Sequence, residues 1–150
     1  MPEPTPAFLL EVLGSVLQDA AFVSADPAPE PARWAGPVIN AELAFESLRG
    51  GSLRLTVAPR GAIELAANML GVDPADREAE AHGLAAVGEL LNVIGGAFVT
   101  RFFGTQVPSQ LGLPRAELAE APPPGRRRTC AAAVTIESGD AVLLELDLEA

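Results

Sequence analysis

The chain has 150 residues, of which 49% are hydrophobic and 20% are charged, values close to the averages of globular domains. This composition excludes a disordered or fibrous protein, and the length fits one domain, residues 1–150, that buries roughly 70% of the surface of its unfolded chain. Twenty acidic residues against ten basic ones give a net charge of -10, which would repel nucleic acid, so we expect no nucleic-acid partner.

The chain also carries no clear signal for export or membrane insertion. Its N-terminus lacks the basic and apolar regions of a signal peptide, and no stretch approaches the roughly 20 apolar residues that cross a bilayer. We therefore expect a cytoplasmic protein with no membrane contact.

The first third of the chain predicts a helix followed by an irregular segment. Apolar residues recur at helical spacing from about 7 to 20, after Thr5 as a cap and Pro6 in the first turn. Four prolines between residues 26 and 37 then argue against regular structure.

Two segments of alternating apolar and polar residues follow. They cover residues 39–46 and 52–57 and are separated by Gly50-Gly51, which permits a tight turn. The short connection predicts an antiparallel hairpin.

The middle of the chain predicts two consecutive helices. The first covers about 62–70 and ends at Gly71, and the second runs from Pro74 to about Phe103. After them, residues 107–120 contain two prolines and are expected to form an irregular or edge segment.

The end of the chain returns to an alternating pattern. Residues 130–136 and 142–148 alternate on either side of Gly139-Asp140, which predicts a second hairpin. The order helix, strands, helices, strands predicts an α+β fold in which helices pack on a mostly antiparallel sheet.

Single cysteine and histidine residues exclude several kinds of site. Cys130 is the only cysteine, so no intramolecular disulfide can form, and its alternating surroundings predict a small buried side chain. His82 is the only histidine, and with no cysteine near it we expect a helix-surface residue and no metal site.

The longer helix is predicted to have two different faces between Leu84 and Phe103. The stripe expected to face the core contains Leu84, Val87, Leu91, Ile94, Phe98 and Phe102. The opposite side is expected to contain Ala85, Glu89, Asn92, Gly96, Val99 and Phe103. Glu89 and Asn92, three residues apart, should project together from this outer face, where small neighbours let a partner protein approach. Such a pair is common on helices, so its spacing alone assigns no function.

A family resemblance adds to this pattern. The segment Glu89-Leu90-Leu91-Asn92-Val93-Ile94-Gly95-Gly96 resembles the Glu-x-x-Asn helix of the CheX/CheC/FliY chemotaxis phosphatases. Residues 65–73 resemble the short helix and acidic turn that lead into that helix, and residues 51–57 resemble the preceding strand. The resemblance covers about 37–148 and implies a CheC/CheX-like fold and, as in CheX, a homodimer.

The resemblance also implies a function and a partner. Family members remove phosphate from the aspartyl phosphate of a CheY-like receiver domain, which supplies its own Mg²⁺, so this chain would need no cofactor of its own. By position, Asn92 would align the attacking water and Glu89 would pair with the receiver's active-site lysine. Ala85, Gly96 and Pro114 would belong to the partner-binding surface.

This sequence departs from the family pattern at two places. Ala85 stands where the family commonly has Asp or Ser, which leaves a second function open: a non-catalytic module that binds a receiver or supports an assembly. The first-half counterpart of the motif pairs Glu64 with Asn68, a spacing of four instead of three. We interpret that pair as structural and expect the single-site arrangement of CheX.

Overall fold

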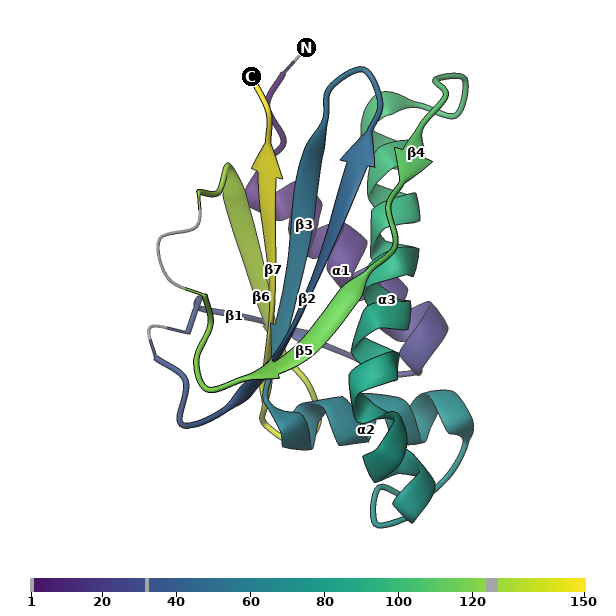
Figure 1. Ribbon diagram of the computed structural model, residues 1–150, viewed down its shortest axis with the longest axis vertical. Helices are drawn as coiled ribbons and strands as arrows, with labels where there is room; N and C mark the ends of the chain where they lie inside the picture. Colours follow the sequence, from purple (N-terminus) through teal and green to yellow (C-terminus); the bar gives the residue numbers. More distant parts are fainter. Residues whose placement is uncertain (1, 32, 124–126) are drawn as a thin grey trace.

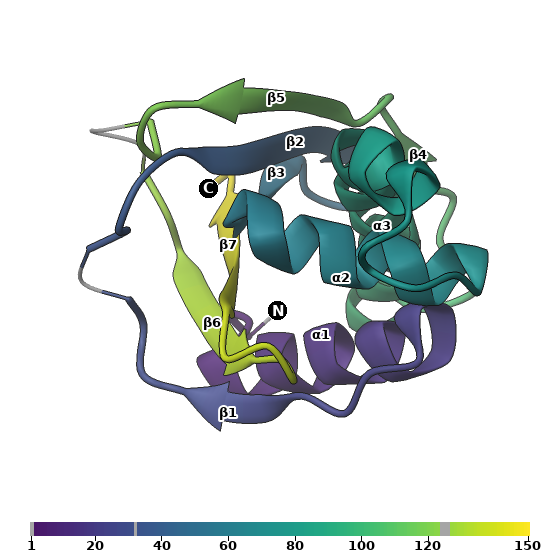
Figure 2. The same ribbon diagram turned by 90° about the horizontal axis from the view of Figure 1, so that it is seen from below.

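The computed structural model describes residues 2–31, 33–123 and 127–150. Within these residues the chain forms three helices and one seven-stranded sheet, with every strand pair antiparallel. The helices lie together on one side of the curved sheet (Figures 1 and 2). The predicted α+β fold is confirmed.

The three helices begin and end where local sequence signals indicate. Their bounds are Pro6–Ala21 for α1, Pro59–Leu70 for α2 and Arg77–Phe103 for α3. The Thr5 hydroxyl accepts a hydrogen bond from the Phe8 amide at the start of α1, and the Asp76 carboxylate accepts one from the Glu78 amide at the start of α3. Gly71 ends α2 with φ of 71°, a left-handed conformation that glycine adopts without strain.

The strands form a sheet in the order β1-β6-β7-β3-β2-β4, with β5 also paired to β2. Their bounds are Asp26–Ala28 (β1), Val38–Glu46 (β2), Gly51–Val57 (β3), Gln110–Leu111 (β4), Arg115–Ala119 (β5), Cys130–Thr135 (β6) and Ala141–Leu148 (β7). Both predicted hairpins are confirmed, as β2–β3 and β6–β7.

Two proline-containing segments supply the edges of this sheet. The expectation of no regular structure over 26–37 is wrong at its start, because β1 pairs with β6 there. Pro27 is tolerated because an edge strand can leave one side of its backbone unpaired. The segment 107–120 contains the short strands β4 and β5, which pair with β2, so its prediction as an irregular or edge segment is confirmed.

The core lies between the inner face of the sheet and the helices. Alternate residues of β2, β3 and β7 are buried there and meet apolar residues of α1 and α3. At its centre, Phe98 of α3 is fully buried and its ring contacts those of Phe8, Phe45, Phe102 and Phe103.

The predicted faces of α3 need correction at three positions. Leu84 was assigned to the core but is 42% exposed, whereas Val99 and Phe103 were assigned to the outer side but are buried. Phe103 packs against the rings of Phe45 and Phe98, and the chain after α3 adds Val107 and Leu111 to the same core. The buried face is therefore wider near the end of α3 than the sequence pattern indicates.

The length and composition of α3 would also allow it to cross a membrane. The same is true of core helices in soluble proteins, and α3 contacts α1, α2, β2 and β5. Because 56% of its most apolar window is buried by these elements, packing within the fold accounts for its hydrophobicity.

Candidate functional site

Glu89 and Asn92 lie on the exposed side of α3, at the place where β5 approaches the helix. Gly88 faces Ala116 of β5, and a Cβ atom added at Gly88 would lie 3.8 Å from the Cβ of Ala116, an ordinary van der Waals contact. The neighbouring Leu90 and Leu91 are fully buried and fix the rotation of the helix. The fold therefore holds one carboxylate and one amide outward, beside the edge of the sheet.

A shallow groove of about 440 Å³ runs between this side of α3 and the chain around β5. It is lined by Leu84, Ala85, Gly88, Glu89, Asn92, Leu113, Pro114 and Ala116. Four of the five residues predicted for the site thus come together, including Pro114, which is distant from the others in sequence. Gly96 does not line the groove and lies farther along α3, beside Leu111.

Two exposed leucines border the polar pair. Leu113 is 89% exposed and Leu84 is 42% exposed, and both line the groove with Glu89 and Asn92. Exposed leucines next to a polar pair are typical of a surface that a partner protein covers. Sequence reasoning missed Leu113, because a single apolar residue between Gly112 and Pro114 has no periodicity that would single it out.

His82 contacts Glu89 directly. Its Nε2 atom lies 3.2 Å from Oε1 of Glu89, and the two side chains are 31% and 55% exposed. Sequence reasoning placed His82 on the helix surface but did not link it to the motif. The available signal was the spacing of seven residues, close to two full helical turns.

Three comparisons with known proteins give different results. No family model matches the sequence. No curated protein matches it either. Solved structures do match: CheX from Desulfovibrio desulfuricans aligns with a TM-score of 0.73 and 20% identity, over 94% of this chain and 96% of that one.

The CheX–CheY–BeF3–Mg²⁺ complex from Borrelia burgdorferi aligns with a TM-score of 0.69 and 18% identity, over 95% of each chain. FliY from Thermotoga maritima aligns with a TM-score of 0.62 and 13% identity, over 93% of this chain and 88% of that one. The chain has the CheX/CheC-like fold. The structural similarity covers more of the chain than the span 37–148 expected from the sequence.

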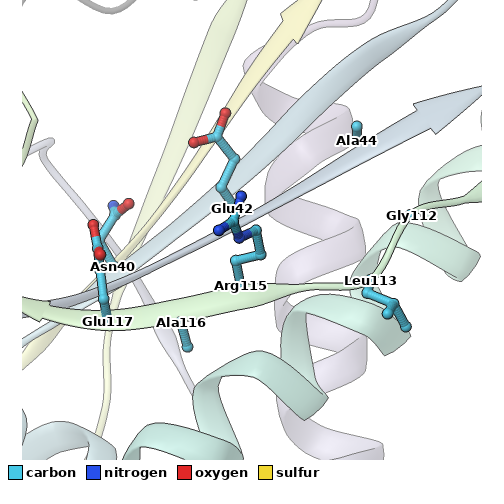
Figure 3. A pocket seen from close by; sticks show the side chains of 8 residues that line it. All are labelled: Asn40, Glu42, Ala44, Gly112, Leu113, Arg115, Ala116 and Glu117. Carbon is cyan, nitrogen blue, oxygen red and sulfur yellow. The ribbon is translucent and has the colours of Figure 1, made fainter.

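The opposite side of β5 in this CheX/CheC-like fold is polar. Arg115 and Glu117 are paired in register with Glu42 and Asn40 of β2, and together they line a hollow on the outer face of the sheet. Figure 3 shows their side chains on one side of β5, with Ala116 on the side that faces α3. Alternation along β5 thus separates a polar surface from the more apolar groove beside Asn92.

Glu64, in the first half of the CheX/CheC-like fold, has a structural contact. Its Oε1 atom accepts a hydrogen bond of 2.9 Å from the backbone amide of Ser138, in the turn between β6 and β7. Arg60, on the same helix, pairs with Asp140 of that turn at 2.9 Å. These contacts fasten α2 to the β6–β7 hairpin and support the structural interpretation of Glu64.

The remaining singled-out groups offer little chemistry. Cys130 is half-buried instead of fully buried, and burial together with the charge of Glu3 raises the pKa of its thiol. A raised pKa keeps the thiol protonated and weakly nucleophilic at neutral pH. Across the described ranges, no three His, Cys, Asp or Glu side chains gather as metal ligands would.

Proposed function

We propose that the protein is a cytoplasmic phosphatase that hydrolyses the aspartyl phosphate of a CheY-like receiver domain in chemotaxis signalling. The observation that carries this proposal is the pair Glu89 and Asn92, exposed together beside Pro114 on a CheX/CheC-like fold. The Borrelia burgdorferi neighbour is a CheX in complex with CheY, BeF3 and Mg²⁺, which supports a receiver as the partner.

Asn92 would act on water. Its amide oxygen can accept a hydrogen bond from a water molecule and orient the water's lone pair toward phosphorus, in line with the bond to be broken. The water oxygen forms a bond to phosphorus, the bond from phosphorus to the aspartyl oxygen breaks, and a proton of the water passes to a phosphate oxygen, so that inorganic phosphate and a free aspartate carboxylate result. Phosphoryl transfer of this kind depends on positioning and charge stabilisation, and the Mg²⁺ and lysine of the receiver would supply the charge.

Glu89 would provide recognition. Its exposed carboxylate, three residues from Asn92, can pair with the receiver's active-site lysine and so fix the position of the amide. Leu84 and Leu113 would pack against the rim of the receiver site and exclude bulk water, which strengthens the ion pair inside.

A phosphate-release assay with a phosphorylated receiver tests this proposal. We expect the protein to accelerate dephosphorylation well above the receiver's own rate. Binding of the receiver without acceleration would refute the enzyme and establish the second candidate, a non-catalytic receiver-binding or assembly module. That candidate is favoured by one observation, the absence of a hydrogen-bonding group at Ala85.

Replacing Glu89 by alanine should weaken recognition more than chemistry. Loss of the carboxylate removes the partner of the receiver lysine, so KM should rise by about 10-fold while kcat changes less. The salt dependence of binding should also decrease, because salt screens exposed charge pairs. Steady-state kinetics at low and high ionic strength measure both effects.

Glu117→Ala is the matched control, since it removes an equal charge from the polar side of β5. It should leave KM within about twofold of the wild type. Equal effects of the two substitutions would show that only net charge matters and that Glu89 has no specific partner.

We also propose that the protein is a homodimer. The sheet has edges at β1 and at β4 and β5, and the short β1 pairs with only part of β6, from Ala133 to Thr135. Open strand edges of this kind are available for pairing with a second copy. Light scattering should give twice the mass of the 15.5 kDa chain, and a monomer at every concentration would contradict the proposal.

A further inference from the structure

The contact between His82 and Glu89 points to a role for the histidine in recognition. We propose that His82 is a positioning residue that holds the Glu89 carboxylate in place for the partner's lysine. The proposal rests on the function proposed above. Its basis is the 3.2 Å distance between Nε2 of His82 and Oε1 of Glu89.

The helix geometry makes this contact specific. A spacing of seven residues separates the two Cα atoms by about 10.5 Å along the helix but leaves them on nearly the same side. Side chains on a helix lean toward its N-terminus, so Glu89 extends back over position 85, four residues earlier. Ala85 carries only a methyl group there, which leaves room for the contact of 3.2 Å between Nε2 of His82 and Oε1 of Glu89.

Within the described residues, Glu89 is the acidic residue that pairs with His82. In the part of the chain that the structure describes, Glu89 is the one carboxylate within 4 Å of a His82 ring nitrogen. Glu78, one turn earlier on α3, has no such contact with His82. The chain around β5 contributes Leu113, Pro114 and Ala116 to the groove, none of which carries a charge.

The contact has a direct consequence for binding. The Glu89 side chain is 55% exposed and would otherwise sample several rotamers, which the partner would have to restrict on binding. Holding the carboxylate in advance reduces that cost. The Ala85 side chain can form no hydrogen bond with this carboxylate, whereas Nε2 of His82 lies 3.2 Å from it.

Kinetics test the role. His82→Ala should raise KM for the phosphorylated receiver by about three- to fivefold with kcat unchanged. In a Glu89→Ala background the same change should have no further effect, because the group being positioned is absent. Ala85→Ser should partly restore KM in the His82→Ala variant, since a serine hydroxyl at 85 can donate to the carboxylate. A fall in KM, or an equal loss in the Glu89→Ala background, would overturn the proposal.

A second measurement does not depend on turnover. His82 is the only histidine, so the untagged protein gives one set of imidazole NMR signals. Glu89→Gln should shift these signals in the free protein, whereas Glu78→Gln should not. If the imidazole signals of His82 are unchanged in Glu89→Gln, the inference is wrong, whatever phosphatase activity the protein has. If the wild type lacks turnover, the proposed function fails, and affinity for a BeF3-loaded receiver then replaces KM in judging His82.

Discussion

Replacing Asn92 by alanine should slow dephosphorylation of the receiver by about 100-fold or more, while receiver binding weakens far less. An amide that positions water acts mainly in the transition state, so its loss should lower kcat. A 100-fold decrease corresponds to about 2.7 kcal/mol of transition-state stabilisation. Single-turnover phosphate release, measured at saturating protein, separates this effect from binding.

The same substitution should leave the fold intact. The Asn92 side chain is exposed on α3, and alanine is the better helix former. The midpoint of thermal unfolding should therefore equal or slightly exceed that of the wild type.

Asn68→Ala is the matched control for Asn92→Ala. Asn68 is the asparagine of the first-half pair, on α2, and lies outside the groove. It should retain full turnover. If Asn68→Ala abolishes turnover while Asn92→Ala keeps it, the site lies on α2 and the assignment to α3 is wrong. Glu64 is less suitable as a control, because its bond to the Ser138 amide makes it part of the fold.

The hairpins could be predicted from the sequence because their signals are local. Residues 39–46 and 52–57 alternate with a period of two, and the turn predicted at Gly50-Gly51 lies at the end of the observed connection 47–50, with Gly51 already in β3. In the structure, Phe45 pairs with Gly51 and Ile39 with Val57, so the register follows from the turn. The strand β1 could not be predicted, because its pairing with β6 joins segments about 100 residues apart and its sequence contains a proline.

The rotation of α3 was predicted only in its middle. A helical wheel assumes that one side of a helix is covered along its whole length. Here Val99 and Phe103 belong to the core, to which Val107 and Leu111 from the chain after α3 are added, while Leu84 lines the groove. Both differences come from contacts between distant segments, to which periodicity is insensitive.

The candidate site, too, could be predicted only where residues close together in the sequence determine it. The spacing placed Glu89 and Asn92 on one face, and the resemblance singled them out from many similar pairs. Only the folded chain brings Pro114 and Leu113 to them, because β5 pairs with β2 and crosses α3 at Gly88. His82 was missed because a contact across seven residues lies beyond the usual neighbours at three and four.

The helix that presents the site also carries the core, and this makes Phe98 the position where a truncation should be most damaging. Phe98 is fully buried, and its ring contacts four other phenylalanine rings from α1, β2 and α3. Phe98→Ala should lower the free energy of unfolding by about 3–5 kcal/mol, from lost burial and from the cavity left among these rings. Urea denaturation monitored by circular dichroism measures the change.

Phe8→Ala is the control, because Phe8 belongs to the same cluster but is only partly buried at its margin. It should cost clearly less, since solvent and neighbouring side chains can fill part of the space that it leaves. A loss below about 1 kcal/mol for Phe98→Ala would show that the cluster collapses around the cavity. Phe98→Ala and Asn92→Ala test opposite faces of α3. Phe98→Ala should lower stability with little effect on the turnover of the folded fraction, whereas Asn92→Ala should lower turnover with little effect on stability.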